Sequence, residues 1–275
     1  MDLQVVRAIS GHTFKEAIRA KWLLMFTAVF FLLAINIPFL VLLFAHYLPP
    51  NYLDVYLTYL ITLSFPFLPL LALPMGAVSI VDERESGVLQ YMLSNPISKS
   101  EYFLGRYLGL FAATTAVIVL GYGIAAGVSY NVSAARYLQV TIPMAVGAVL
   151  NAAMLGLALI ASILTKRKAT ALGAAIFLWF LFTVLSNLGF LSIVIALSLT
   201  QESVVTLVLL NPIETARILA VSLTGGGISE LGTTGLVFQN IFGKSAWIVL
   251  TDGLMGWAVG ATAICFLLFK RRDPV

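Results

Sequence analysis

Long apolar runs without a charged side chain divide the sequence. Residues 55–81, 107–135 and 169–201 contain no Asp, Glu, Lys or Arg. A helix needs about 20 apolar residues to cross a bilayer, and only helices and closed barrels satisfy their backbone groups there. Of the 275 residues, 10% are charged, whereas soluble domains carry about 25%. The sequence therefore predicts an all-α integral membrane protein.

Six runs are predicted to cross the membrane as one transmembrane domain, 1–275, which leaves no room for a soluble catalytic domain. The expected spans are 22–45, 57–81, 107–130, 138–165, 169–198 and 246–269. The second span contains three prolines, so several carbonyls are freed and must be satisfied by neighbouring groups. These prolines are Pro66, Pro69 and Pro74. The fifth run is long, and a break is expected at 186–189.

The distribution of basic residues predicts the orientation. With six spans, four segments of the chain lie on one side of the membrane, and they hold four, three, three and three basic residues. These are 13 of the 16 Lys and Arg. They are Arg7, Lys15, Arg19 and Lys21; Arg84, Lys99 and Arg106; Lys166–Lys168; and Lys270–Arg272. Such an excess marks the cytoplasmic side. We therefore expect a plasma-membrane protein with both termini in the cytoplasm. A seventh crossing at 187–210 would place Lys270–Arg272 outside, so six spans are preferred.

The first 21 residues have an amphipathic pattern. Apolar residues recur roughly at helical spacing, and Arg7, Lys15 and Arg19 fall elsewhere on the helical wheel. A basic amphipathic helix of this kind lies in the membrane interface. The alternative is an ordinary basic N-terminus that only sets the topology.

The longest charged interruption, Val81–Leu108, lies between the second and third spans. It holds an acidic cluster, a glycine, an amphipathic octad and a proline: Asp82, Glu83, Arg84, Glu85, Gly87, Val88–Asn95 and Pro96. The proline disfavours helix at the preceding residue. Ser98 and Glu101 have the spacing of a capping box, which predicts a second helix start. We call this segment the elbow and predict helix, break, helix. A simpler interpretation is a solvated loop whose charges mark the membrane boundary.

Residues 199–245 form the largest segment predicted to lie outside. Asn211 is an expected N-cap, Pro212 occupies the first helical position and Glu214 follows three residues after the cap. The predicted helix includes Arg217, runs towards Leu223 and ends at a glycine cluster. A flexible loop, 228–243, is expected to follow.

Three stretches resemble a known family, the ABC-2 type transporter permeases. The elbow resembles the coupling element of these proteins, and Phe14–Trp22 is similar to their N-terminal amphipathic helix. Leu209–Arg217 resembles a segment of the NosY-like permeases of the nitrous-oxide-reductase maturation system. The resemblance covers nearly the whole chain.

The resemblance implies a permease subunit that works as a homodimer, each copy docking one cytoplasmic ABC ATPase. Mg-ATP would be bound and hydrolysed by the ATPases. Residues Asp82, Glu83, Arg84 and Glu85 would contact the ATPase, with Gly87 permitting close approach and Pro96 separating two short helices. These acids are expected at the solvent edge, so reversing the charge of Glu83 and Glu85 should cost little stability.

On the outer side, the capped helix has apolar residues that one short loop cannot cover, so we expect Asn211–Leu223 to pack as a lid over the path between the two copies. We expect this lid to include Asn211, Pro212, Glu214 and Arg217. The loop after it would contact an extracytoplasmic partner, and the resemblance implies that this partner is β-helical. The alternative is a lid that only seals the pore.

Little in the sequence indicates catalysis, a metal site or nucleic-acid binding. Two His and one Cys offer little for a metal or a catalytic group. Gly243-Lys244-Ser245 lacks the glycine that a phosphate-binding loop requires at position 238. We therefore expect no enzyme and no bound cofactor. Asp252, the one clear charge inside a span, either lines a polar path or sits in the interface. Asn36, Asn151 and Asn187 are expected to bond between helices.

Three other functions remain open. A stand-alone secondary transporter often shows inverted repeats and intramembrane charges, whereas this sequence shows no convincing repeat and its spans are nearly free of charge. A membrane-embedded enzyme lacks a cluster of acids, His or Cys at one depth. A scaffold that transmits force without transport would carry the same coupling device, so the sequence does not separate it from a transporter.

Overall fold

The computed structural model describes residues 2–44, 52–128, 134–196, 200–225 and 233–272. The regular structure of these residues is helical throughout, as predicted. The helices are α1 Leu3–Arg19, α2 Lys21–Phe44, α3 Tyr52–Ser64, α4 Pro69–Glu85, α5 Val88–Ser94, α6 Lys99–Val128, α7 Ala134–Leu164, α8 Lys168–Ala196, α9 Gln201–Leu209, α10 Pro212–Thr224, α11 Thr233–Phe242, η2 Gly243–Ser245 and α12 Ala246–Arg271.

Four helical segments in the described residues are long and apolar enough to cross a membrane. They are Asp54–Glu85, Lys99–Gly127, Gln139–Leu164 and Thr234–Arg271. The pair α9 and α10 passes the same test together, but the two helices are bent by 103° at their junction. The described parts of α2 and α8 contain shorter apolar helices. A multi-pass membrane protein is thus confirmed, and the count of six spans stays a prediction.

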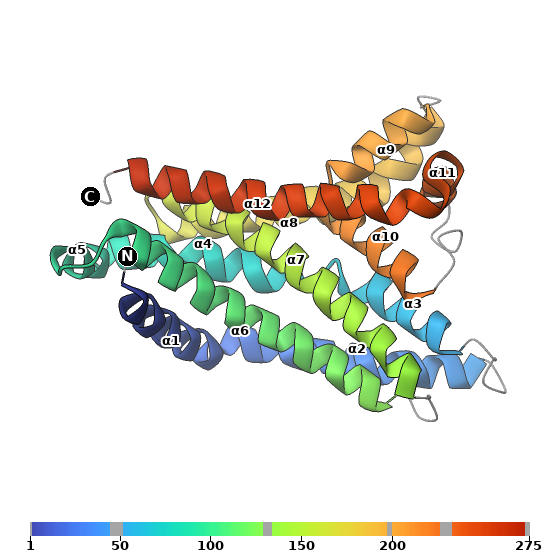
Figure 1. The fold of residues 1–275 in the computed structure, drawn as a ribbon, viewed down its shortest axis with the longest axis horizontal. Coiled ribbons are helices and arrows are strands. Elements are labelled where there is room, and N and C mark those ends of the chain that lie inside the picture. Colours follow the sequence, from blue (N-terminus) through green and yellow to red (C-terminus); the bar gives the residue numbers. More distant parts are fainter. Residues whose placement is uncertain (1, 45–51, 129–133, 197–199, 226–232, 273–275) are drawn as a thin grey trace.

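The long helices run lengthwise through the molecule, and α5 projects at one end (Figure 1). The start of α1 and the end of α12 lie at that same end. The backbone N–H of Asp2 donates to the Glu101 carboxylate, and the Lys99 ammonium donates to the carbonyl of Arg272. We call this the α5 end, and α11 lies at the opposite end.

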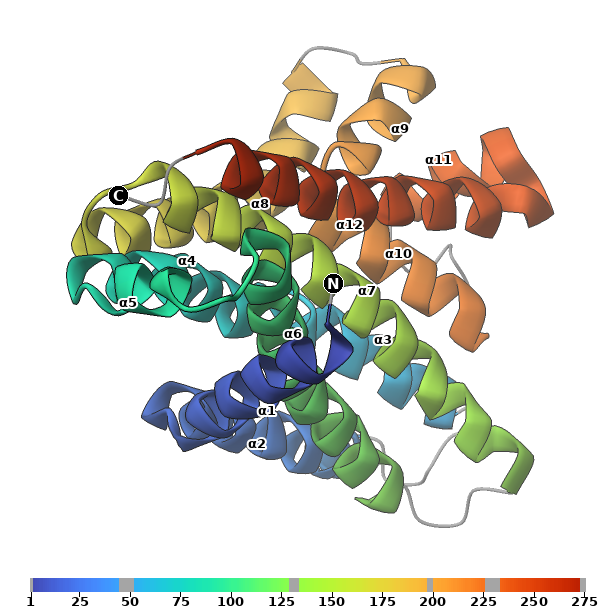
Figure 2. The same cartoon turned by 60° about the vertical axis from the view of Figure 1, so that its left-hand side comes forward.

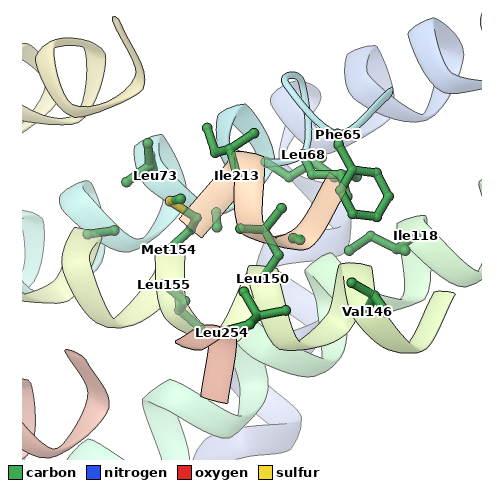
Figure 3. Close-up of a cluster of buried hydrophobic side chains, with 14 of the residues drawn as sticks. Phe65, Leu68, Leu73, Ile118, Val146, Leu150, Met154, Leu155, Ile213 and Leu254 are labelled. Atoms are coloured by element: carbon green, nitrogen blue, oxygen red, sulfur yellow. The ribbon is translucent and has the colours of Figure 1, made fainter. Parts of the chain in front are cut away.

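Helix α7 lies at the centre of the packing. It contacts α4, α6, α10 and α12. Figure 3 shows the buried cluster around it: Leu150, Met154 and Leu155 of α7 meet side chains from the neighbouring helices. Those neighbours include Phe65, Leu68, Leu73, Ile118, Ile213 and Leu254. The core thus joins the second predicted span to α10 and α12.

The prolines of the second span break it into two helices. Helix α3 ends at Ser64 and α4 begins at Pro69. The Trp179 indole N–H donates to the freed carbonyl of Pro66 at 2.9 Å. The expectation that neighbouring groups satisfy such carbonyls is confirmed at this position. Pro74 is accommodated inside α4.

The amphipathic N-terminal helix packs on α6 through two glycines (Figure 2). A Cβ at Gly105 would lie 2.7 Å from the Cβ of Ile9, and one at Gly109 would lie 2.6 Å from the Ser10 carbonyl oxygen. The apolar face of α1 is buried at Val6 and Ala17. Its amphipathic pattern thus has a packing role as well as any role at the membrane surface.

Replacing Gly109 by Ala is expected to loosen α1 from α6. Overpacking of this kind costs about 1–3 kcal/mol. Gly123 on the same helix is the matched control, because a Cβ there meets nothing within 4 Å. Protease accessibility of α1 and thermal unfolding in detergent should respond to Gly109→Ala and not to Gly123→Ala. Equal behaviour of the two variants would contradict this packing.

Two local predictions are wrong. Helix α8 runs from Lys168 to Ala196 without the break expected at 186–189. A helix, α11, occupies Thr233–Phe242 within the stretch expected to be a flexible loop. It forms because its apolar residues have a surface to cover: Phe238 is fully buried and its ring packs on that of Phe242.

Candidate functional site

The elbow folds as two helices around a turn and an extended link. Ser86 and Gly87 separate α4 from α5, and Gly87 has a φ of 76°. A Cβ at Gly87 would meet nothing within 4 Å. The glycine is therefore needed for its left-handed conformation, and its role in the close approach of an ATPase stays a prediction.

The predicted break and helix start after α5 are confirmed. Asn95 is extended, with φ −79° and ψ 164°, as expected for the residue before Pro96. The Glu101 N–H donates to the Ser98 hydroxyl at 3.2 Å, and the Ser98 N–H donates to the Glu101 carboxylate at 2.9 Å. This is the capping box. The helix that it starts is α6 itself, so Pro96 separates one short helix from a long one.

Arg106 joins three helices at the α5 end. Its guanidinium donates to the Ser79 hydroxyl of α4 at 2.9 Å and pairs with Glu16 of α1 at 2.8 Å. It also pairs with Glu83 of α4 at 3.0 Å. The Arg106 side chain is only 8% exposed, and a charge buried to this extent is tolerated only when it is paired. We call Arg106, Glu16, Glu83 and Ser79 the arginine hub.

Glu83 therefore lies inside the elbow. Its side chain is 16% exposed, and it also accepts a hydrogen bond from the Tyr102 hydroxyl. The expectation that Glu83 sits at the solvent edge is wrong, so the reason given for a small stability cost on reversing its charge does not hold. Four consecutive charged side chains at the end of a helix spread around its circumference, so at least one of them must face the bundle.

The other three residues of the cluster bind the turn between α7 and α8. Asp82 pairs with the Lys168 ammonium at 2.8 Å, and Glu85 accepts from the Lys168 backbone N–H at 3.1 Å. Arg84 donates to the carbonyl of Thr165 at 3.0 Å. These three residues thus hold the elbow against the turn between α7 and α8 of the same chain. Asp82 and Glu85 remain exposed, so contact with an ATPase stays a prediction for them.

The outward face of α5 carries apolar side chains that point away from the bundle. Leu89 is fully buried and anchors the helix, whereas Val88 is 44% and Tyr91 is 72% exposed. Positions three apart lie on one helix face. The sequence analysis did not single these residues out. The available signal was the octad itself, which holds more apolar residues than one buried face requires.

A largely apolar cavity of about 480 Å³ lies beside the arginine hub. Glu16, Ser79, Asp82 and Arg106 contribute to its polar side. The rest of its lining comes from α1, α4, α6 and α8, and includes Pro74, Met75, Leu172 and Ile176. The elbow is thus continuous with a cavity between the helices that it connects.

The α9–α10 pair inserts into the bundle. Asn211 caps α10 as predicted, accepting from the backbone N–H of Ile213 at 2.9 Å, and its amide donates to the carbonyl of Phe182 at 2.8 Å. The Trp257 indole donates to the carbonyl of Leu209 at 2.9 Å. Phe182 and Trp257 lie near the middle of α8 and α12. The bend between α9 and α10 therefore reaches halfway along the neighbouring helices.

This position differs from that of a lid lying on the outer surface. Helix α10 begins at Pro212, as predicted, but it is mostly buried and contacts α3, α7 and α12. Glu214 and Arg217 form an ion pair on this helix, and both side chains are mostly buried. Local capping signals define where a helix starts, but they carry no information on its depth.

The remaining polar residues have separate positions. The Asn151 amide donates to the hydroxyls of Thr114 at 2.8 Å and Thr115 at 3.0 Å, which confirms a bond between helices. The Asn36 amide donates to Leu32 of its own helix. Asp252 is exposed on α12, and its role in a path stays a prediction. The side chain of Asn187 lies outside the described residues.

Among the residues that the structure describes, no group of three or more His, Cys, Asp or Glu could hold a metal ion. The geometry instead places a short helix with exposed apolar side chains at one end of the helical bundle.

The model of a family described as ABC-2 family transporter protein matches residues 7–274. The chain belongs to the ABC-2 transporter family. It is similar to a probable ABC transporter permease protein NosY of Pseudomonas aeruginosa, with 27% identity over 98% of this chain and 99% of the relative. A protein of the same description from Stutzerimonas stutzeri is 24% identical over 96% of this chain and 97% of the relative. This ABC-2 permease is thus NosY-like along its whole length.

Proposed function

We propose that this ABC-2 permease works as a homodimer and that α5 of each copy docks a separate ABC ATPase. The observation that carries the proposal is the exposure of Val88 and Tyr91 on a short helix that the buried side chain of Leu89 anchors. Exposed aromatic side chains on a rigid support are typical anchors of protein interfaces. Mg-ATP is bound and hydrolysed by the ATPase, and this chain supplies no catalytic group.

The arginine hub supplies the means of transmission. Helices α4 and α6 continue directly from the two ends of the elbow, and Arg106 ties both to α1. A displacement of α5 therefore moves three helices together. Packed helices shift between discrete arrangements, and the ATPase biases that equilibrium by its differential affinity for the two. The cavity beside the hub changes shape as α1, α4, α6 and α8 move.

Purification of the chain from its native membrane tests this function. We expect an ABC ATPase to co-purify, and we expect nucleotide to change the protease accessibility of the elbow. Transport by the purified chain in vesicles without any ATPase would contradict the proposal and favour the secondary transporter. Whether the coupled work is substrate export or a conformational change in a partner is then read from vesicles that contain both subunits.

The proposed topology has six spans in the plasma membrane and cytoplasmic termini. The common position of the start of α1 and the end of α12 supports an even number of crossings. A reporter active only outside the cell, fused after Lys270, is expected to give no signal. The same reporter inserted at Lys244 is the positive control. A strong signal from the first fusion would contradict six spans.

At the opposite end, we propose contact between α11 and an extracytoplasmic β-helical partner, as part of nitrous oxide reductase maturation. The resemblance of Leu209–Arg217 to the NosY-like permeases of that system motivates this role, and the two similar proteins are described as NosY permeases. Leu236 and Ile241 of α11 are exposed, whereas Phe238 is buried. Replacing both exposed residues by Asp is expected to release the partner while basal ATPase activity is kept. If the partner stays bound with unchanged affinity, α11 does not contact it, and the alternative of a segment that only seals the pore is favoured.

A further inference from the structure

A second groove lies between α6 and α12. Its volume is about 490 Å³ and its lining is almost entirely apolar. The side chains that form its walls are Phe103, Leu104, Val259, Thr262, Ala263 and Phe266. The rings of Phe103 and Phe266 meet edge to face, with centroids 5.5 Å apart. Phe103 and Leu104 belong to the part of the elbow that starts α6, but none of the groove residues lines the cavity beside the arginine hub.

Two lysines stand where this groove opens at the α5 end. Lys99 precedes Phe103 by four residues on α6, and Lys270 follows Phe266 by four residues on α12. Residues four apart lie on one helix face, so each lysine sits one turn beyond a wall of the groove. The Lys99 ammonium donates to the carbonyl of Arg272 at 3.2 Å, which holds the ends of the two helices together.

The charge at this opening is positive. Lys270, Arg271 and Arg272 are exposed in succession at the end of α12. Glu101, an acid near this opening among the residues that the structure describes, is buried and accepts hydrogen bonds from the backbone N–H groups of Asp2 and Ser98. A molecule that fits both the apolar groove and its positively charged opening has an apolar chain and an anionic headgroup.

The length of the groove fits one membrane leaflet. Val259, Ala263, Phe266 and Lys270 share a helix face, and the distance from Val259 to Lys270 is about 16 Å at a rise of about 1.5 Å per residue. Half of a hydrocarbon core is about 15 Å. An acyl chain that lies along this face therefore brings its headgroup to the lysines.

We propose that the groove between α6 and α12 binds an acyl chain of an anionic phospholipid whose phosphate contacts Lys99 and Lys270. The site is separate from the docking face of α5, so lipid binding there can be tested independently of ATPase coupling. Its occupancy would link α6 to α12 at the point where α6 leaves the elbow.

The test is lipid binding to the purified full-length chain in detergent, measured by native mass spectrometry. Phosphatidylglycerol and phosphatidylcholine with identical acyl chains are titrated separately. A basic residue near an anionic lipid surface contributes roughly a fivefold change in affinity. We expect the wild-type chain to prefer phosphatidylglycerol. The double variant Lys99→Gln/Lys270→Gln is expected to lose between about fivefold and 25-fold of that affinity.

Two controls make the result specific. Lys15→Gln/Lys166→Gln removes two exposed lysines from other surfaces and is expected to leave the affinity unchanged. Ala263→Phe fills the groove from an exposed position and is expected to weaken binding of the lipid while the melting temperature without lipid is kept. Glycerol phosphate, which has no acyl chain, is expected not to compete.

Three results would overturn the proposal. Equal affinity for the two lipids would show that the groove does not select an anionic headgroup. Equal losses of affinity in the two double-lysine variants would show that overall surface charge, and not Lys99 and Lys270, attracts the lipid. Competition by glycerol phosphate at the same concentration as the lipid would identify a soluble phosphate ligand instead.

Discussion

Replacing Tyr91 by Glu is expected to prevent stable binding of the ATPase while the membrane fold is kept. Tyr91 is 72% exposed, so the folded chain loses little when the ring is removed. In an interface, truncating an anchoring aromatic residue typically costs about 2 kcal/mol or more, which corresponds to roughly a 30-fold loss of affinity. A buried, unpaired carboxylate would add to that loss.

Co-elution of the ATPase with the permease in detergent and the rate of ATP hydrolysis by the reconstituted complex measure this effect. Tyr91→Phe is the matched control, since it keeps the ring and is expected to retain binding. Thermal unfolding of the permease alone should be the same for all three chains. If Tyr91→Glu binds the ATPase as tightly as the wild type, α5 is not the docking helix.

Replacing Glu83 by Gln is expected to destabilise the permease by about 3 kcal/mol. The change leaves the Arg106 guanidinium, which is 8% exposed, with only the half-exposed Glu16 as a charged partner. Removing one member of a buried ion pair typically costs about 3–5 kcal/mol, because the remaining charge is uncompensated. The midpoint of chemical unfolding in detergent measures this loss.

Glu85→Gln is the control for that experiment, because it changes the same residue type two positions away. Glu85 is exposed and accepts a bond from a backbone N–H, and exposed substitutions usually change stability by at most about 0.5 kcal/mol. Equal effects of the two Glu→Gln variants on the unfolding midpoint would contradict the role of the arginine hub in stability.

The amino-acid sequence was sufficient for several features of this protein. Charge-free runs predicted a helical membrane protein, because a backbone in lipid must satisfy its own hydrogen bonds. The capping box at Ser98, the cap at Asn211 and the break at Pro96 were also predicted correctly. Each depends on residues within one helical turn, so the chain encodes them locally. Family membership was likewise readable from short stretches of sequence.

Other features were decided only by the tertiary structure. Glu83 and Glu85 are the same residue two positions apart, yet one is buried against Arg106 and the other is exposed. The depth of the bend between α9 and α10 likewise depends on the Phe182 carbonyl, which accepts from Asn211, and on the Trp257 indole, which donates to Leu209.

Sequence pattern assigns a residue to a helix and to an approximate face. Which neighbour that face meets depends on how the helices pack against one another. For this permease, composition and local signals determined the helices and where they begin and end. The packing of α1, α4 and α6 around Arg106 determined which of the clustered charges hold the fold together and which remain exposed.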